Sequence, residues 1–282
     1  MKAYVSIGAI YRNEAHYLPE WLEFHRLMGV ERFFLYNNRS TDNHLEVLAP
    51  YMEEGSVVWH DWPMFPGQYE SYEDCFRTHR DDARWIAFID LDEFMFAPTG
   101  EQLPDVLREF ESYPGVVVNS IYYGTSFHEA PPEGPVIENY TRRLGLDAPR
   151  NRIVKSIVDP QRTARVGNVC HYFRYDGGKK AVNENFLAVA GEATREVSVE
   201  RLRINHYFTR SHQERLEKLK RPGILHGHLV PHIEEVEERD RRLNQEVDEV
   251  LVPYGRAVRA ALAARQAGAP LPIGSLETAL SR

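Results

Sequence analysis

Short apolar runs alternate with amphipathic segments along the first 122 residues of the chain. Residues 3–10 form an apolar run typical of a buried strand, and apolar residues then recur at helical spacing between residues 18 and 28. The expected strands cover residues 3–10, 32–36, 57–59, 85–89 and 116–122, and the expected helices cover residues 18–28, 42–52, 69–83 and 103–110. Strands that alternate with helices predict βαβ units, and therefore an α/β fold with a mostly parallel central sheet flanked by helices.

The pattern changes after residue 123. Gly, Pro and His residues mark a loop around residues 127–135. Shorter strands are expected over residues 153–158, 163–173 and 197–207. Ser211 precedes Glu214 by three residues, which predicts a capping box at the start of a charged helix.

The C-terminal part of the chain has the composition of a solvent-facing helix. Residues 233–266 are rich in Glu, Arg, Leu and Ala. We therefore expect one domain over residues 1–220 and a helical extension over residues 221–282.

A pair of aspartates ends the fourth expected strand. Asp90 and Asp92 follow the apolar run 85–89, and alternation along a strand predicts that both carboxylates point the same way. Open α/β sheets bind ligands outside the carboxyl ends of their strands. Two carboxylates there suit a hard divalent cation that holds a phosphate, and the alternative is a solvated acidic turn.

Polar residues also follow the first three expected strands. They are Arg12, Asn13 and Glu14 after the first strand, Asn37 to Asp42 after the second, and His60 and Asp61 after the third. If these strands are parallel, their ends lie along one rim of the sheet and form one shallow site together with the aspartate pair.

Composition narrows the possible functions. The net charge of -8 argues against a protein that binds duplex nucleic acid, since such a protein carries a basic face. Two cysteines, Cys75 and Cys170, predict neither a disulfide framework nor a cysteine-rich zinc site. No apolar run has the length of a membrane span, and the first run lacks a signal cleavage pattern. We expect a cytoplasmic protein, with peripheral membrane contact left open.

Several motifs together resemble a known enzyme family. They lie at residues 12–14, 17–25, 29–31, 34–42, 88–94 and 204–207, followed by Ser211. This combination resembles glycosyltransferase family 92 and is similar to the wider family-2-like transferases with a GT-A fold. The resemblance runs from about residue 6 to residue 220. Arg12 stands where many members have lysine, which keeps the charge. The loop around Phe127 and the tail after residue 221 resemble the family less.

The resemblance implies an inverting hexosyltransferase that uses a nucleotide-diphosphate sugar, expected to be a UDP-sugar. The acceptor would be a glycan, lipid-linked or protein-linked, as in polysaccharide biosynthesis. Mn²⁺ or Mg²⁺ would neutralise the leaving diphosphate. In this interpretation Asp92 binds the metal, Asp90 binds the ribose or shares the metal, and His206 is the third ligand, with His171 as the competing candidate. Arg12, Asn13, Glu14, Asn37 and Asp61 are expected to hold the nucleotide.

Inversion requires a general base for the acceptor hydroxyl. Glu184 lies about as far beyond the aspartate pair as the base does in similar transferases, and Glu129 lies in a loop expected to face the same rim. Arg152 and Lys155 are expected to meet the diphosphate, or else to form the solvent face of a strand. A non-catalytic nucleotide- or carbohydrate-binding module and a nucleotidyltransferase on a related fold are the alternatives. A phosphatase is disfavoured, because its nucleophilic aspartate normally follows the first strand.

Overall fold

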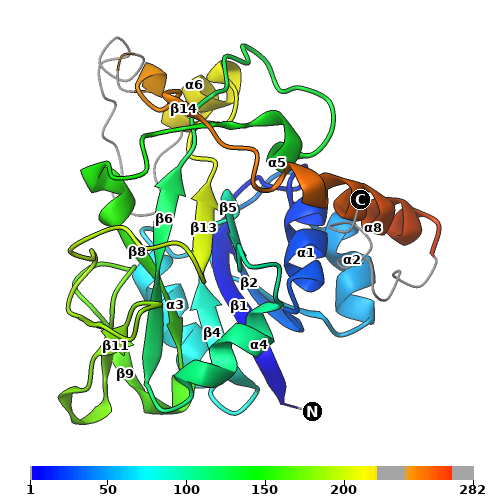
Figure 1. Ribbon diagram of the computed structural model, residues 1–282. Coiled ribbons are helices and arrows are strands. Elements are labelled where there is room, and N and C mark those ends of the chain that lie inside the picture. The colour runs from blue at the N-terminus through cyan, green and yellow to red at the C-terminus, as the bar shows by residue number, and fades with distance from the viewer. Residues whose placement is uncertain (1, 221–237, 239, 269–282) are drawn as a thin grey trace.

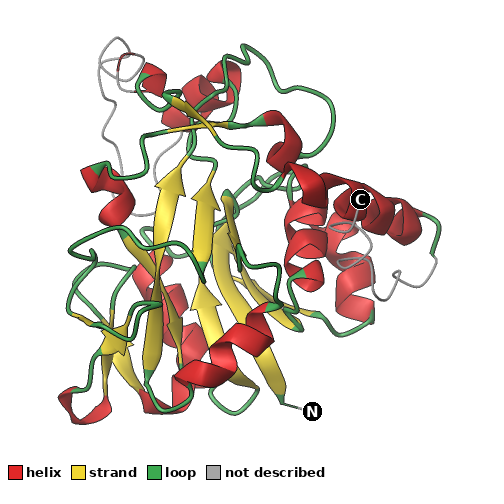
Figure 2. Cartoon of the chain, in the orientation of Figure 1, coloured by secondary structure: helices red, strands yellow, loops and turns green. Residues whose placement is uncertain are grey.

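The computed structural model describes residues 2–220, 238 and 240–268, and its centre is a ten-stranded mixed sheet (Figures 1 and 2). The strands are β1 Ala3–Tyr11, β2 Arg32–Asn37, β3 Val57–Asp61, β4 Ala83–Phe88, β5 Glu93–Phe96, β6 Gly115–Tyr122, β8 Val154–Val158, β11 Ala181–Val182, β12 Ala188–Val189 and β13 Arg203–His206. Their order is β12-β11-β6-β8-β4-β1-β2-β3, with β13 pairing with both β5 and β6.

Helices, 3-10 turns and two small two-stranded sheets complete the regular structure of the described residues. The helices are α1 Leu18–Leu27, α2 His44–Glu53, α3 Gln68–Thr78, α4 Leu103–Leu107, α5 Val136–Asn139, α6 His212–Lys220 and α8 Gly255–Gln266. The 3-10 turns are Arg108–Phe110, Pro149–Arg152, Pro160–Arg162, Asp176–Gly178 and Val252–Tyr254. The small sheets pair β9 Thr163–Val166 with β10 Phe173–Tyr175, and β7 Arg142–Arg143 with β14 Glu246–Val247.

The first three strands end side by side. β1 pairs in parallel with β2, and β2 pairs in parallel with β3, so that Tyr11 lies opposite Asn37 and Asn37 lies opposite Asp61. β4 pairs in parallel with the other side of β1. The expected rim of polar strand ends is therefore confirmed.

The short strand β13, which comes late in the chain, lies next to the acidic turn that contains Asp90 and Asp92. β13 lies between β5, to which it is antiparallel, and β6, to which it is parallel. In this register His206 lies opposite both Glu93 and Tyr122. A residue more than one hundred positions along the chain is thereby placed next to the acidic turn after β4.

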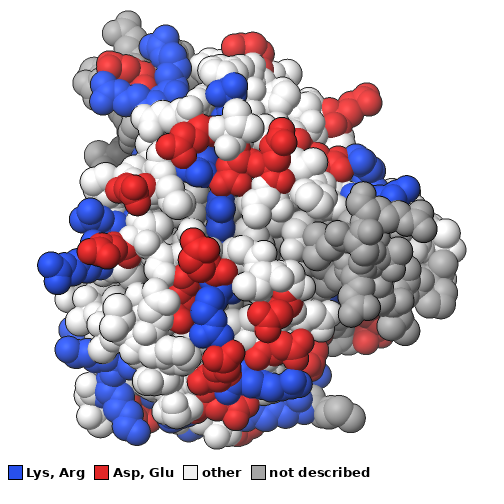
Figure 3. Space-filling view, viewed as in Figure 1, with Lys and Arg blue, Asp and Glu red and all other residues white. Residues whose placement is uncertain are grey.

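The surface carries charges of both signs. On the face shown in Figure 3, acidic and basic side chains are interspersed.

Among the helices of the described residues, none is both long enough and apolar enough to cross a bilayer.

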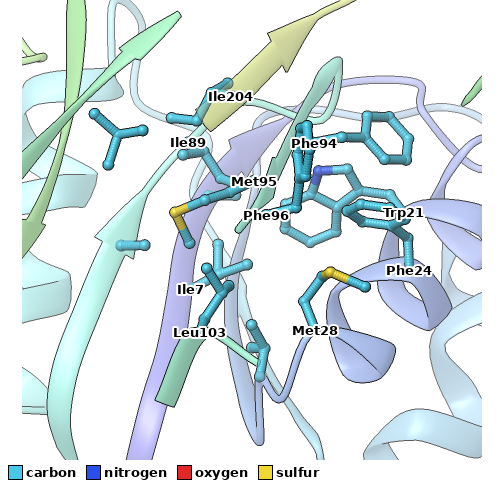
Figure 4. Packing of buried hydrophobic residues seen from close by; sticks show 14 of the residues in the cluster. Ile7, Trp21, Phe24, Met28, Ile89, Phe94, Met95, Phe96, Leu103 and Ile204 are labelled. Atoms are coloured by element: carbon cyan, nitrogen blue, oxygen red, sulfur yellow. The ribbon is translucent and has the colours of Figure 1, made fainter. Parts of the chain in front are cut away.

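Two apolar cores lie on the two faces of the sheet. One core contains side chains of α1, α2, α4 and α8, and Figure 4 shows Trp21 and Phe24 of α1 close to Phe94 and Phe96 of β5. The other core lies under α3 and the β9–β10 hairpin. α1 begins with Pro19 in its first turn, where the missing N–H costs nothing, and α8 packs against α1.

The strand and helix pattern of the first 122 residues is confirmed in outline, but β5 was not expected and two further points differ. The helix expected over residues 69–83 ends at Thr78, because β4 already begins at Ala83. The aspartate pair lies in a turn after β4 and not on the strand, since β4 ends at Phe88. The side chains of Asp90 and Asp92 are therefore not placed by strand alternation.

The later part differs more from its prediction. Residues 163–173 form two strands joined by a loop, and only Arg203–His206 of the run 197–207 is a strand. Of residues 233–266, the last twelve form α8, while residues 240–254 contain β14 and a 3-10 turn. Residues 233–237 and 239 of that predicted helix lie outside the described residues. A composition rich in Glu and Arg therefore did not distinguish the helical part of this segment from its non-helical part.

Candidate active site

Asp90 is held by partners from two other elements. Its Oδ2 lies 2.5 Å from Nζ of Lys155 on β8, and its Oδ1 accepts a hydrogen bond of 3.0 Å from Nε2 of Gln68 on α3. Burial opposes ionisation of this carboxyl, but the Lys155 ammonium outweighs it and lowers the pKa of Asp90. Burial likewise opposes the charge of Lys155, and Asp90 and Glu93 outweigh it and raise the pKa of that ammonium well above its usual value. Asp90 is therefore an ionised and anchored carboxylate.

Asp92 has different partners. Its Oδ2 lies 2.6 Å from Nζ of Lys218 on α6, and its Oδ1 lies 3.4 Å from Nε2 of His206. Burial raises the pKa of Asp92, but Lys218 and His206 outweigh burial and hold it well below the usual range. The side chain of Lys218 is 51% exposed, so the main partner of Asp92 can move away.

A small cavity of about 120 Å³ opens beside Asp92. It is lined by Asn13, Glu14, Tyr17, Asp92, Tyr207, Phe208, Thr209, Arg210, Glu214, Glu217 and Lys218. Arg210 donates to Glu14 at 2.8 Å and to the carbonyl oxygen of Leu91 at 3.3 Å. The loop after β13 is thereby tied to both β1 and the acidic turn.

Further cations gather around Phe208 at the edge of this cavity. The guanidinium carbon of Arg150 lies 4.3 Å from the ring centre of Tyr122 and 4.5 Å from that of Phe208, and Arg215 lies 4.4 Å from the Phe208 ring. Nε of Arg215 is also paired with Oδ2 of Asp240 at 2.7 Å. Guanidinium groups therefore stack on aromatic rings where the cavity meets Phe208.

The predicted nucleotide residues lie at or just after the ends of the first three strands, and two of them, Asn37 and Asp61, bond to each other. Asn13 accepts a hydrogen bond of 2.7 Å from the backbone N–H of Thr41, and Asn37 donates to Asp61 at 3.2 Å. Asn13 has a left-handed φ of 56°, which asparagine tolerates better than most residues. In the described structure the buried Nε of Arg12 has no hydrogen-bond partner.

Two predicted diphosphate ligands do not converge. Lys155 is buried on β8 and forms ion pairs with Asp90 and Glu93, whereas Arg152 is exposed at the end of a 3-10 turn. The alternative interpretation, in which Lys155 lies on the solvent-exposed face of a strand, is also wrong, because its side chain is buried. Regular alternation could not predict this, because the strand begins only at Val154.

The two candidate general bases lie in unlike surroundings. Glu184 is buried and accepts hydrogen bonds from the backbone N–H groups of Glu200, Arg201 and Leu202. These contacts describe a structural anchor and do not support a catalytic role, which stays a prediction. Glu129 is exposed, and its carbonyl oxygen accepts from the N–H of Gln213 at the start of α6, at 2.9 Å.

His171, the competing metal ligand, lies near the acidic turn as well. Burial first, and then Lys155, lower the pKa of His171 to about 3, while Asp90 acts in the opposite direction. Its buried Nδ1 has no hydrogen-bond partner among the described residues. His206 and His171 both therefore stay candidates for a nitrogen ligand.

The donors beside the cavity fit a cation such as Mn²⁺ or Mg²⁺ that is also bound by a substrate phosphate. In the described parts of the chain, no three His, Cys, Asp or Glu side chains are arranged as a complete metal site. Asp92 and His206 nevertheless converge next to the cavity. A cation that is also held by substrate phosphates and water needs only one or two protein carboxylates, so this donor set is sufficient.

Sequence reasoning missed Arg210, Lys218 and Arg150. Arg210 directly precedes the predicted capping residue Ser211, and Lys218 lies two turns into the helix that Ser211 begins. Their positions in the sequence resemble those of ordinary surface cations. Only the fold of α6 back over the strand ends brings Lys218 to Asp92.

The parallel strands β3-β2-β1-β4, the acidic turn and the late strand β13 define a GT-A fold. Among solved structures, S. aureus TarS in complex with UDP superposes with a TM-score of 0.39 and 15% identity, over 57% of this chain and 47% of that chain. Glucosyl-3-phosphoglycerate synthase from Mycobacterium tuberculosis, in complex with Mn²⁺ and UDP, gives 0.31 and 18%, over 45% and 47%.

The profile of glycosyltransferase family 92 matches residues 2–239, and the chain belongs to this family. A family 92 protein of Oryza sativa subsp. japonica is 35% identical over 177 residues, which cover 61% of this chain and 30% of the rice protein. A galactan beta-1,4-galactosyltransferase of Arabidopsis thaliana is 32% identical over 106 residues, covering 34% and 20%. The chain spans about a third of the length of the curated family 92 relatives. The resemblance inferred from the motifs is confirmed.

Proposed function

We propose that the chain is a metal-dependent, inverting glycosyltransferase that moves a hexosyl group from a UDP-sugar to a glycan, lipid-linked or protein-linked acceptor. The observation that carries this proposal is Asp92, an ionised carboxylate at a cavity lined by Asn13, Arg210 and Lys218. A carboxylate and cationic side chains around one cavity suit a ligand that brings both a divalent cation and phosphates.

In this proposal the two aspartates have different tasks. Asp92 and Nε2 of His206 would hold the cation, which would supply Lewis-acid stabilisation of the leaving diphosphate. Asp90 is fixed by Lys155 and keeps the turn in place. Lys218 and Arg210 are suited to the diphosphate oxygens, because both line the cavity. Asn13 and the paired Asn37 and Asp61 hold the nucleoside, and Arg12 contributes the positive charge beside them.

Inversion places the acceptor hydroxyl opposite the leaving diphosphate. A carboxylate removes the hydroxyl proton while the acceptor oxygen forms its bond to the anomeric carbon and the bond to the diphosphate breaks. We place this base at Glu129, because its loop contacts the first turn of α6 and because the Glu184 carboxylate is already occupied by backbone N–H groups. Arg152 has no role in this scheme.

We further propose that residues 1–220 form the transferase domain and that the C-terminal extension packs on it. α8 supports this, since Nε of Arg265 lies 3.0 Å from Oε1 of Glu23 on α1. A cytoplasmic location and peripheral membrane contact stay predictions.

A UDP-release assay tests the function. The full chain is incubated with UDP-sugars, beginning with UDP-galactose because some relatives are galactosyltransferases, with and without Mn²⁺ and with EDTA. We expect UDP release that requires Mn²⁺ and rises with acceptor. In the same assay Glu129→Gln should lose about 100-fold or more in kcat, while Glu133→Gln in the same exposed loop should be active. Sugar binding without metal and without UDP release would favour a binding module.

A further inference from the structure

Glu93 is the buried residue that connects the acidic turn to the rest of the site. It is the first residue of β5 and is fully buried. Its backbone N–H donates to the carbonyl oxygen of Asp90 at 3.1 Å, and its own carbonyl oxygen accepts from Nε1 of Trp21 at 2.8 Å. Hydrogen bonds of its own backbone therefore fix the position of Glu93, independently of its side chain.

One oxygen of the Glu93 carboxylate holds the Asp90 side of the turn. Oε2 accepts a hydrogen bond of 2.9 Å from the backbone N–H of Asp90, and it lies 2.9 Å from Nζ of Lys155. Lys155 in turn holds the carboxylate of Asp90. Glu93 thereby fixes Asp90 twice, through its backbone and through a shared lysine.

The other oxygen faces His206. Oε1 accepts from Oγ of Ser120 on β6 at 3.1 Å, and it lies 3.2 Å from Nδ1 of His206. This contact is not aligned as a hydrogen bond, and His206 Nδ1 has no other hydrogen-bond partner in the described structure. A small rotation of the ring makes Glu93 the acceptor for Nδ1–H.

The two nitrogens of His206 then have separate partners. Nδ1 faces Glu93, and Nε2 faces Oδ1 of Asp92 at 3.4 Å. A histidine that binds a metal through one nitrogen usually donates its other N–H to a carboxylate, which fixes the tautomer and the ring orientation. The geometry around His206 has this form, with Nε2 directed toward Asp92, which lines the cavity.

We propose, building on the function proposed above, that Glu93 is the positioning residue of this site. Its carboxylate holds His206 and the Asp90 turn so that Nε2 of His206 and the carboxylate of Asp92 are presented together to a divalent cation. Glu93 does not touch the cation or the substrate.

The competing explanation is that Glu93 only stabilises the fold as a buried ion-pair partner. Glu23 provides the matched control, because it is also a fully buried glutamate and its partner is Arg265 of α8. Both Glu93→Gln and Glu23→Gln remove a buried negative charge and leave a cation with one partner fewer. A purely structural role predicts that both variants lose stability and that neither loses affinity for the cation selectively.

The experiment measures Mn²⁺ binding to the full chain in the presence of saturating UDP, by the electron paramagnetic resonance signal of free Mn²⁺. Thermal unfolding is recorded for every variant. We expect Glu93→Gln to bind Mn²⁺ about 10- to 100-fold more weakly than wild type, as is typical for a carboxylate behind a ligating histidine. Glu23→Gln should bind Mn²⁺ as wild type does.

A second variant with a smaller structural change tests the same role if Glu93→Gln does not fold. Ser120→Ala removes one donor to Oε1 and leaves every charge in place. It should also weaken Mn²⁺ binding, with little loss of thermal stability.

The outcomes separate this inference from the proposed function. If wild type binds Mn²⁺ and the folded Glu93 or Ser120 variants bind it equally well, the positioning role is wrong and the proposed function stands. Equal weakening in Glu93→Gln and Glu23→Gln also overturns the positioning role. If wild type itself binds no Mn²⁺ with UDP, both the metal-dependent function and the inference fail.

Discussion

Asp90 and Asp92 are two residues apart but are not equivalent. Asp90 is paired with Lys155, 65 positions along the chain, and Asp92 with Lys218, 126 positions along the chain. Lys155 is buried, while Lys218 is largely exposed. The sequence predicted two carboxylates at the rim correctly. It could not predict that the two carboxylates have different partners, because those partners are lysines of β8 and α6 that only the folded chain brings close to them.

This difference predicts unequal losses of stability for the two amide variants. Asp90→Asn leaves Lys155 without its closest counter-charge, and removing one partner of a buried pair costs about 3 kcal/mol. Asp92→Asn leaves only the exposed Lys218 without an anion, which costs less than about 1 kcal/mol. Urea unfolding measures both free energies. Equal destabilisation by the two substitutions would contradict the assignment of Asp90 as the anchored carboxylate.

Lys218 should compete with the cation for Asp92. Its Nζ lies 2.6 Å from Oδ2 of Asp92, so a cation bound there has to displace it. Lys218→Met should therefore raise Mn²⁺ affinity in the absence of nucleotide by up to about fivefold, the equivalent of the ~1 kcal/mol of an exposed ion pair. Isothermal titration of Mn²⁺ checks this, and Lys220→Met, on the same helix, is the control. Unchanged or weaker affinity in Lys218→Met would show that the ammonium does not occupy the cation's position.

At the scale of elements, periodicity predicted the first half of the sheet and its helices well. Apolar runs and helical spacing are local signals, and the capping box predicted at Ser211 is present, since its Oγ and the Glu214 carboxylate exchange hydrogen bonds with each other's backbone N–H. β5 and β13 have four residues each and were missed or overextended. Their pairing is long-range, and strands this short carry little periodic signal.

The packing of α1 on β5 depends on a neutral histidine. Nδ1 of His25 donates to the carbonyl oxygen of Trp21 at 2.8 Å, and Nε2 accepts from the N–H of Met95 at 3.1 Å. Burial lowers the pKa of His25 to about 3, although the Trp21 carbonyl acts in the opposite direction. The unfolded chain therefore takes up this proton at a higher pH than the folded protein does.

The consequence is a loss of stability in acid. The stabilisation from neutral His25 is complete above its unfolded pKa of 6.5 and is lost progressively as the pH falls from 6.5 toward 3. Between pH 7 and pH 5, wild type should lose about 2 kcal/mol more unfolding free energy than His25→Gln, which has no such proton. Urea unfolding at both pH values provides the measurement. Identical pH dependence in the two proteins would mean that the buried ring is not neutral.

At the scale of the whole molecule, the sheet brings distant polar groups to one end. β1, β2 and β3 supply the residues that we propose hold the nucleotide, the turn after β4 supplies the carboxylates, and α6, which follows β13, lies above the strand ends in Figure 1. Composition and motif order predicted the fold class and the family, because these depend on the pattern as a whole. Glu93, Arg210 and Lys218 were not predicted, since each acquires its role only through contacts made by the folded chain.

Both charge signs are mixed over the face shown in Figure 3. The central claim is that Asp92 makes binding of a nucleoside diphosphate depend on a divalent cation. Within this site the cation and the diphosphate are neighbours, and each should strengthen the binding of the other.

Thermal unfolding with UDP, with and without Mn²⁺, tests this claim most directly when wild type and Asp92→Asn are compared side by side. UDP with Mn²⁺ should stabilise wild type by about 2.7 kcal/mol at a hundredfold excess over the dissociation constant. UDP with EDTA should stabilise it far less, and Asp92→Asn should not distinguish the two conditions. Equal stabilisation of wild type by UDP in Mn²⁺ and in EDTA would contradict the claim.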